Sequence, residues 1–481
     1  MTTPEYRSAG AAPSGSGFNE GIRANASGLF LFTLAVADRP ESALFKGWLL
    51  LGLGALLLGG VFSVLIVLSR TPFFQDIIPW VDFFHTALVV HVDLTVLVWF
   101  LAFAGLLWCH GAGRRLHGSG VFAVLLATCG AAVIALSPFT GNGNPLMSNY
   151  VPVLRNPVFF TGMVLFAAGF AIQVVRALAT PWHFSGGISG EDTLRFGLFV
   201  AAVASFLSGY ALLMSWLGLG NAMQGLAWFD RLFWGSGHVM QICHTQLMLI
   251  AWLWLASISG APLRLSPRVV FVLFFLGMSP LFMVPVIYLS LEVTSGAHLF
   301  WFTQLMKYGG VLGALPIGLA VVWALAEHRS ALSGKQAERN ALVVSVLLFG
   351  AGGIIGFLIR GSDVTVPAHY HGSIVGITVA FMGVTYHLLP ALGYRRVTTR
   401  LAQWQPWLYG GGQLMHILGL AWSGGYGVQR KVAGAAQGLD RIEQVAGMAL
   451  MGIGGLISII GGFLFLLIAW ISIRPMVRSS P

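Results

Sequence analysis

The chain has 481 residues, of which 57% are hydrophobic and only 9% are charged. A soluble protein would carry charges at about a quarter of its positions. Here the charges cluster between apolar runs of roughly 20 residues, the length that spans a bilayer. This composition excludes an ordinary soluble enzyme. The net charge of +10 does not indicate nucleic-acid binding, because cations on the loops at one membrane face are a topology signal.

The cysteines Cys109, Cys129 and Cys243 are widely spaced, with neither a C-x-x-C nor a C-x-x-C-H pattern. This spacing excludes a disulfide framework, an iron-sulfur site and covalently attached haem c within the chain. The first 27 residues are polar and rich in Gly and Ser, with no apolar core before a cleavage site. We therefore expect no cleavable signal, and we expect the first span to act as an anchor.

The apolar runs predict an all-α polytopic membrane protein, a bundle of twelve transmembrane helices. With the N-terminus inside, most Lys and Arg residues of the loops fall on the cytoplasmic side, so both termini are expected there. Residues 1–45 are then a cytoplasmic segment, 46–473 the membrane domain and 474–481 a cytoplasmic tail. The spans are predicted near 46–68, 84–108, 120–138, 157–177, 195–219, 235–257, 268–290, 302–326, 341–360, 367–391, 405–424 and 445–473.

Several histidines are predicted to lie in one layer near the outer surface. His85 is at the lip of span two and His91 about two turns in, while His238 is in the first turn of span six. His298 is in the outer loop region before span eight, and His369 and His371 open span ten. Histidine is costly in hydrocarbon without a partner, so convergence of several indicates a ligand site. Histidines predicted at the inner surface, as solvated residues, are His110, His117, His183, His328 and His387.

The stretch AHYHGSIVG places His369 and His371 two positions apart on a predicted helix. An α-helix turns about 100° per residue, so these side chains point about 200° apart and cannot share one small ligand. A zinc site of the H-x-H type needs a strand. Imidazole commonly binds haem iron, so the helix is suited to hold two haems, one on each side.

At these residues the sequence resembles subunit I of the haem-copper oxidase superfamily, which includes cytochrome c oxidases and nitric oxide reductases. The resemblance covers the whole chain and places it in a bacterial cytoplasmic membrane. It implies that His369 binds a high-spin haem and that His371 binds a low-spin haem together with His91, with His85 as the backup. It also implies a non-haem metal, copper or iron. The motif WGSGH supplies His238 to that metal, and His298 is its second ligand.

The resemblance also implies partners. In GVQRK, Arg430 and Lys431 correspond to a basic pair that contacts haem propionates, although an ordinary pair of loop cations stays open. Electrons would come from an outer-side donor subunit of the cytochrome c or cupredoxin type. Membrane lipid surrounds the chain, and no nucleic acid is expected. Asp93 is expected near a haem edge, on a proton path from outside, or as a buried polar partner. The loop 141–157 has turn chemistry suited to capping a site beneath it.

The sequence departs from the family pattern at the second metal. Leu299 follows His298 where oxidases have a second histidine, and Glu292 or Gln241 are the candidates to complete the ligand set. A carboxylate such as Glu292 would favour iron over copper. The span-six tyrosine and glutamate are replaced by Ile242 and Met240, and the span-eight lysine by Ala320, so that proton pumping by the usual route is not expected.

These departures favour reduction of NO to N2O, which needs two electrons and no tyrosine donor. Reduction of O2 to water at the same centre is the alternative. A secondary transporter without haem is an alternative of another class, and it would show mid-membrane helix breaks and internal repeats. A haem-bearing carrier or sensor that has lost its second metal is a further alternative. His416, in the middle of span eleven, is expected to make a helix–helix hydrogen bond.

Overall fold

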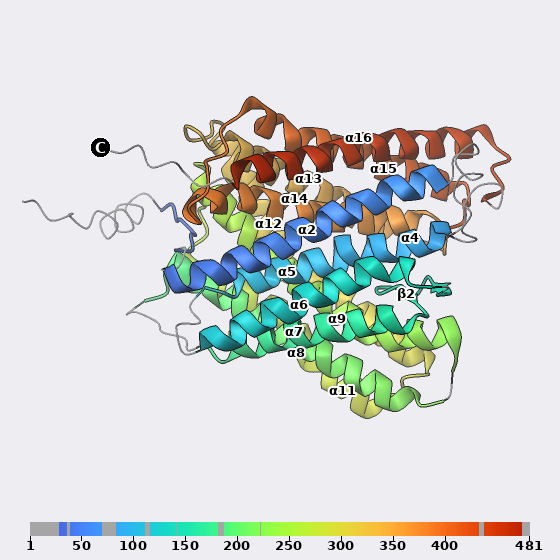
Figure 1. The fold of residues 1–481 in the computed structure, drawn as a ribbon. Helices are drawn as coiled ribbons and strands as arrows, with labels where there is room; N and C mark the ends of the chain where they lie inside the picture. The colour runs from blue at the N-terminus through green and yellow to red at the C-terminus, as the bar shows by residue number, and fades with distance from the viewer. Residues whose placement is uncertain are drawn as a thin grey trace, which may run out of the picture.

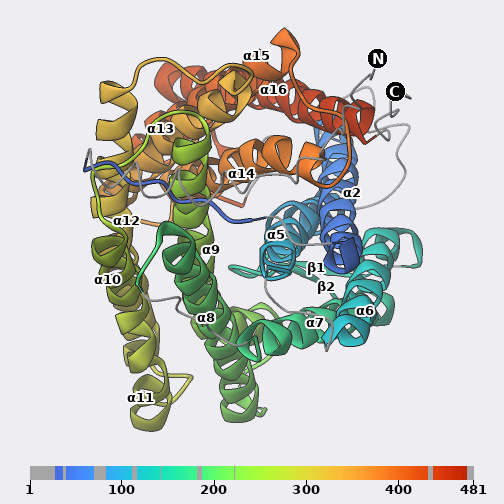
Figure 2. The ribbon, with the colours of Figure 1, turned by 90° about the vertical axis from the view of Figure 1, so that its left-hand side faces the viewer.

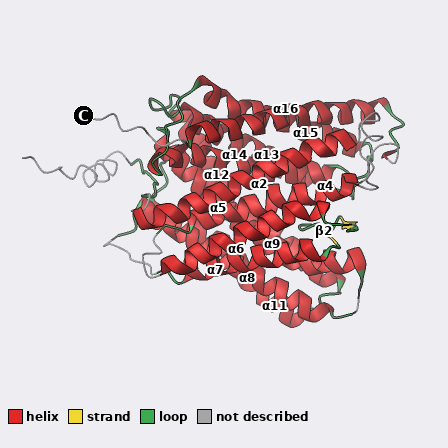
Figure 3. Cartoon of the chain, viewed as in Figure 1, coloured by secondary structure: helices red, strands yellow, loops and turns green. Residues whose placement is uncertain are grey.

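The computed structural model describes residues 28–35, 39–69, 83–110, 116–141, 143–180, 187–221, 223–431 and 437–473. The predicted cytoplasmic tail at 474–481 lies outside these residues, as does most of the predicted N-terminal segment, and so does His183. The described chain is almost entirely helical (Figure 3). The prediction of an all-α polytopic membrane protein is confirmed.

Eleven described helical segments are long and apolar enough to cross a membrane. The remaining predicted span, near 405–424, is also a long helix, α15, but its glutamines lower its hydropathy. The elements are α2 (Arg39–Ser69), α4 (Phe83–Val92), the π-helix η1 (Asp93–Val98), α5 (Trp99–Leu107), α6 (His117–Leu136), the 3-10 turn η3 (Ser137–Phe139), β1 (Pro145–Leu146), β2 (Val153–Leu154), α7 (Pro157–Leu178), α8 (Gly190–Leu219), α9 (Gly225–Ile258), α10 (Pro267–Met278), the 3-10 turn η4 (Ser279–Phe282), α11 (Met283–Ser290), α12 (Gly296–Glu327), α13 (Gln336–Leu358), α14 (Thr365–Ala391), α15 (Arg400–Gly425) and α16 (Ile442–Ser472).

The helices run side by side along one axis (Figure 1). Seen along that axis, α14 lies inside a curved wall made by the other helices (Figure 2). The most buried spans are α9 and α14. In each, 78% of the residues in its apolar stretch are buried inside the protein. These two helices carry His238, His369 and His371, so the predicted ligands lie on the interior helices.

Glycines allow the helices to pack closely. At Gly352 on α13, a Cβ would lie 2.6 Å from the backbone nitrogen of Ser373 on α14. At Gly419 on α15, a Cβ would lie 2.4 Å from the carbonyl oxygen of Gly447 on α16. Such contacts bring backbones together where lipid offers no hydrophobic drive for association. They fix α13 against α14 and α15 against α16.

Two predicted positions need correction. His238 is not in the first turn of its helix, because α9 begins ten residues before the apolar run, at Gly225. The added turns are mostly apolar but carry the charged pair Asp230 and Arg231. Arg231 donates to the carbonyl oxygen of Ser295 at 3.0 Å. His298 is not in a loop, because α12 begins at Gly296 and the Ser295 hydroxyl caps it by accepting from the His298 amide.

A short hairpin joins α6 to α7. Strands β1 and β2 pair antiparallel, with Pro145 opposite Leu154. The hairpin lies at one end of the bundle, opposite the end where α2 begins (Figure 1). We call this end of the bundle the hairpin end.

Candidate functional site: a histidine-lined cavity

A cavity of about 2140 Å³ opens inside the bundle, lined mainly by apolar side chains. Ordinary ligand pockets measure about 300–1,000 Å³, so this cavity has room for more than one large cofactor. It brings together helices from both halves of the chain. The histidines that line it are His85, His91, His238, His244, His369, His371 and His416.

His91, on α4, is anchored to α2. Its Nδ1 lies 2.9 Å from the carbonyl oxygen of Gly59 and 2.9 Å from the hydroxyl of Ser63. A carbonyl oxygen can only accept, so Nδ1 carries the ring proton and Nε2 keeps its lone pair. Histidine ligands of metals are usually oriented by such a bond. His91 is therefore held in the tautomer that can bind iron.

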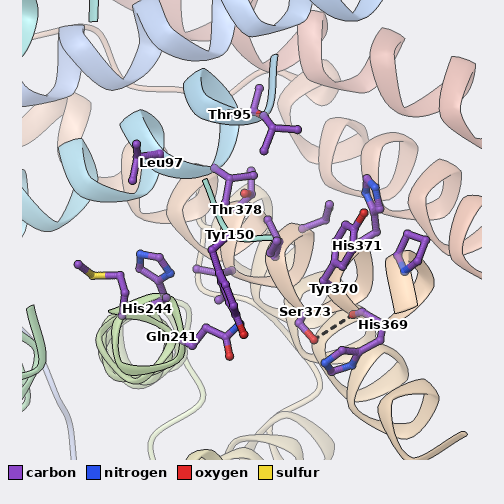
Figure 4. A pocket seen from close by; sticks show the side chains of 18 of the residues that line it. Thr95, Leu97, Tyr150, Gln241, His244, His369, Tyr370, His371, Ser373 and Thr378 are labelled. Carbon is purple, nitrogen blue, oxygen red and sulfur yellow. Dashed lines mark hydrogen bonds between the residues drawn. The ribbon is translucent and has the colours of Figure 1, made fainter. Parts of the chain in front are cut away.

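His369, on α14, is anchored to α13 in the same way. Its Nδ1 donates to the carbonyl oxygen of Gly352 at 2.7 Å. The neighbouring Gly356 leaves room for the ring, because a Cβ there would lie 2.7 Å from Nδ1. His371 leaves α14 in a different direction (Figure 4). The prediction that these two imidazoles serve different partners agrees with this geometry.

His371 lies beside His416, with their ring centroids 4.9 Å apart. His371 is also close enough to His91 for an electrostatic interaction. The Nδ1 of His416 donates to the carbonyl oxygen of Met451 at 3.0 Å, which confirms the expected helix–helix hydrogen bond. Nothing in the sequence indicates that His416 lines the cavity beside His371.

His238, on α9, donates from Nδ1 to the carbonyl oxygen of Trp234 at 2.7 Å. The hydroxyl of Tyr150, which comes from the hairpin between β1 and β2, lies 2.9 Å from Nε2 and 3.0 Å from Nδ1 of His238. The Tyr150 ring lies against Gly237, where a Cβ would be 2.2 Å from the ring. Its hydroxyl also bonds with the side chain of Gln241, beside which it lies in Figure 4. Sequence reasoning missed Tyr150, because a contact across 88 residues leaves no local pattern.

Several bonds hold the hairpin in place. The Asn149 amide donates to Asp230 Oδ1 at 2.7 Å, and Lys431 Nζ donates to the carbonyl oxygen of Met147 at 2.6 Å. Burial and the nearby Arg430 charge lower the pKa of Lys431, while the Asp230 carboxylate raises it. Burial raises the pKa of Tyr150, and the bond with Gln241 opposes this shift in part. Tyr150 is therefore a neutral phenol at physiological pH.

Arg430 and Lys431 both line the cavity. Arg430 Nε donates to the Ser362 hydroxyl at 3.1 Å. Lys431 is bonded to the hairpin, and both cations are placed where a cofactor carboxylate in the cavity could accept charge-assisted bonds.

His298 does not line the cavity with His238. Its ring packs between Tyr288 and Phe302, with centroid distances of 5.1 and 4.9 Å. Both of its nitrogens are buried with no hydrogen-bond partner among the described residues. Glu292 is exposed in the turn before α12. Among the described residues, no three His, Cys, Asp or Glu side chains approach closely enough to hold a metal ion.

Asp93 is fully buried, and neither carboxylate oxygen has a hydrogen-bond partner within the described chain. It begins the π-helix η1, which directly follows His91. Single π turns occur often at functional sites. Asp93 is not among the residues that line the cavity.

The residues present fit two haems. The cavity volume, the anchored tautomers of His91 and His369, and the cations at the rim are what two dianionic porphyrins require. They fit a second metal less well, because the described part of the chain provides two separate imidazoles, His238 and His298, and no third donor with them.

Comparisons place the chain among known proteins. No family model matches the sequence. An uncharacterized protein of Rickettsia prowazekii (strain Madrid E) is 28% identical over 497 residues, covering 89% of this chain and 95% of that protein. An uncharacterized protein of Aquifex aeolicus (strain VF5) is 32% identical over 348 residues, covering 72% of this chain and 85% of that protein.

Among solved structures, a haem-copper terminal oxidase dimer, determined by cryo-electron microscopy, matches with a TM-score of 0.67. The match covers 93% of this chain and 86% of that chain at 18% identity. Identity this low shows a shared fold alone. The sequence likeness is closer, and by it the chain belongs to the same protein family as the Aquifex aeolicus protein.

Proposed function

We propose that the chain is the haem-binding catalytic subunit of a membrane respiratory terminal reductase that reduces a diatomic gas. The observation that carries the proposal is the pair of anchored imidazoles. His91 and His369 come from distant segments, each has Nδ1 tied to a glycine carbonyl on a neighbouring helix, and both line one cavity. The fold shared with a haem-copper terminal oxidase supports the same conclusion.

Each residue has a separate role in this proposal. His91 and His371 would ligate a low-spin haem, and His369 a high-spin haem. Arg430 and Lys431 would pair with propionates. The haems, when bound, would supply electron storage and gas binding. The protein supplies the fixed tautomers, the apolar walls that exclude water, and the cations at the rim.

The electron donor would be a separate subunit on the hairpin end, since the chain has no C-x-x-C-H motif. The hairpin end would then face outward, and both termini would be cytoplasmic. A bacterial cytoplasmic membrane is the setting that this arrangement requires.

Two gases are candidate substrates. The sequence favours NO, because Ile242 replaces the span-six tyrosine and Leu299 replaces a metal-binding histidine. Oxygen is favoured by one observation, the Tyr150 hydroxyl at His238.

The test is optical spectroscopy of the purified protein with matched variants. His91→Ala should abolish the low-spin bands of the reduced-minus-oxidised spectrum, and His369→Ala should abolish the spectral change on CO binding. His328→Ala is the control, because His328 bonds to Ala324 outside the cavity. A wild-type protein without haem bands would overturn the proposal. The alternative function, a secondary transporter without haem, would then remain. Haem bands without CO binding would indicate an electron carrier.

A further inference from the structure

Helix α15 presents polar side chains to the part of the cavity where His371 lies. We infer that His416 is a positioning residue of the proposed low-spin site: it accepts a hydrogen bond from His371, orients that ligand and sets the reduction potential of its haem. The inference rests on the proposed function. It gives a role to a histidine for which the sequence predicted only a helix–helix contact.

The first support is what His371 lacks. The other proposed haem ligands, His91 and His369, each donate from Nδ1 to a glycine carbonyl on a neighbouring helix. Within the described residues, the His371 ring has no such carbonyl partner. It lies against the His416 ring, with centroids 4.9 Å apart and planes at 61°. Because a ligand histidine usually has an orienting bond from its second nitrogen, this contact identifies His416 as the partner.

The second support is the tautomer of His416. Its Nδ1 lies 3.0 Å from the carbonyl oxygen of Met451, which can only accept, so Nδ1 carries the proton and Nε2 keeps its lone pair. Gly455 leaves room for the ring, because a Cβ there would lie 3.3 Å from His416 Nδ1. When iron binds Nε2 of His371, Nδ1 of His371 keeps its proton and becomes a donor. One ring thus supplies the donor and the other the acceptor.

The third support is a second acceptor one turn away. Gln413 also lines the cavity, and its Oε1 is buried with no hydrogen-bond partner among the described residues. Residues three apart on a helix lie on the same face, so Gln413 and His416 direct two acceptors into a cavity that is otherwise mainly apolar. A buried acceptor is costly unless a donor meets it. The protonated nitrogen of His371 is a donor in ring contact with this wall.

The bond has a consequence for electron transfer. An acceptor at Nδ1 raises the basicity of a ligand imidazole, and the more basic ligand stabilises ferric over ferrous iron. The bond therefore lowers the reduction potential of the haem, since hydrogen bonding around the ligands is one of the means by which a protein sets it. Loss of such a partner typically changes metal affinity 10- to 100-fold. A tenfold change in the ferric-to-ferrous affinity ratio corresponds to about 59 mV for one electron.

The experiment compares His416→Asn with His416→Gln in the purified protein. Asparagine keeps an N–H near the position of Nδ1 for the Met451 carbonyl, but it does not reach the position of Nε2. Glutamine reaches that position with its carbonyl oxygen. In a potentiometric titration of the low-spin bands, His416→Asn should raise the midpoint potential by at least about 59 mV, a tenfold change, and His416→Gln should restore it towards the wild-type value.

A second readout is the electron paramagnetic resonance spectrum of the ferric low-spin haem. Its largest g value should shift in His416→Asn and stay near the wild-type value in His416→Gln. Leu418→Phe is the control for a change on the same helix, because Leu418 is exposed and is not among the residues that line the cavity.

The outcomes separate this inference from the proposed function. A wild-type protein without low-spin haem bands overturns the function. Wild-type bands together with an unchanged potential and g value in His416→Asn overturn the inference alone, as does an equal shift in Leu418→Phe. Loss of the low-spin bands from both His416 variants would make His416 an iron ligand itself, which also overturns the inference. If His416→Asn does not fold, His416→Phe replaces it, because its ring fills the same space without an acceptor and the same rise in potential is expected.

Discussion

Substitution of Gly356 by alanine tests the anchoring of His369 directly. The new methyl group would lie 2.7 Å from His369 Nδ1 and 2.8 Å from Cε1. Ordinary contact begins near 3.4 Å, so the imidazole must retreat by roughly 0.7 Å. A retreat of that size takes the 2.7 Å bond to the Gly352 carbonyl beyond the range of a good hydrogen bond.

Loss of such an orienting bond typically lowers ligand affinity 10- to 100-fold, which corresponds to about 1.4–2.7 kcal/mol. The assay is the CO-difference spectrum of the purified variant, titrated against added haem. We expect the high-spin component to weaken by that factor, while the low-spin bands assigned to His91 and His371 persist.

Gly411→Ala is the matched control. It makes the same change inside a helix, and a Cβ at Gly411 meets no atom within 4 Å. Both variants gain the same intrinsic helix preference, up to about 1 kcal/mol, so any difference between them comes from the contact with His369. A Gly356→Ala protein with an undiminished CO spectrum would refute the assignment of His369 as a haem ligand.

Two further predictions concern the ends of the bundle. Lys431→Met removes the bonds from Lys431 to Met147 and Asn149. Amide hydrogen exchange at residues 147–150 should then accelerate about 10- to 100-fold, as expected for loss of a charged hydrogen bond. Unchanged exchange would show that these bonds do not hold the hairpin. Burial lowers the pKa of His110 to about 4. The positive charge of Arg195 lowers this pKa further, and a hydrogen bond to the Ala35 backbone opposes the shift. This neutral histidine therefore stabilises the fold above pH 6.5, and that stability is lost as the pH falls towards 4. In His110→Gln, unfolding temperatures measured between pH 7 and 4 should fall less steeply than in wild type.

The sequence was sufficient to predict the helices, because hydrocarbon accepts only spans with internally satisfied backbones. It also predicted that His91, His238, His369 and His371 lie in one layer, since their depth follows from helix geometry. All four line the cavity, and their role as ligands stays a prediction. The helix starts at Gly225 and Gly296 were missed, because the polar side chains of Asp230, Arg231 and His298 interrupt the apolar runs near the start of each helix.

Tertiary contacts account for the rest. Tyr150 reaches His238 through a loop whose path depends on Lys431 and Asp230. His416 faces the cavity because the glycines that pair α15 with α16 set its rotation. His110, predicted to be solvated, packs against the rings of Phe45 and Trp254. None of these contacts has a local signature in the sequence.

The bonds from Lys431 to Met147 and Asn149 join residues 284 and 282 positions apart. Because a chain is synthesised from its N-terminus, these bonds cannot form until nearly nine-tenths of the polypeptide has been made. Until then Lys431 cannot bond to the hairpin, and this contact at the hairpin end of the cavity is absent. The order of translation thus leaves an interval before this contact forms, in which the proposed haems would have a route into the cavity.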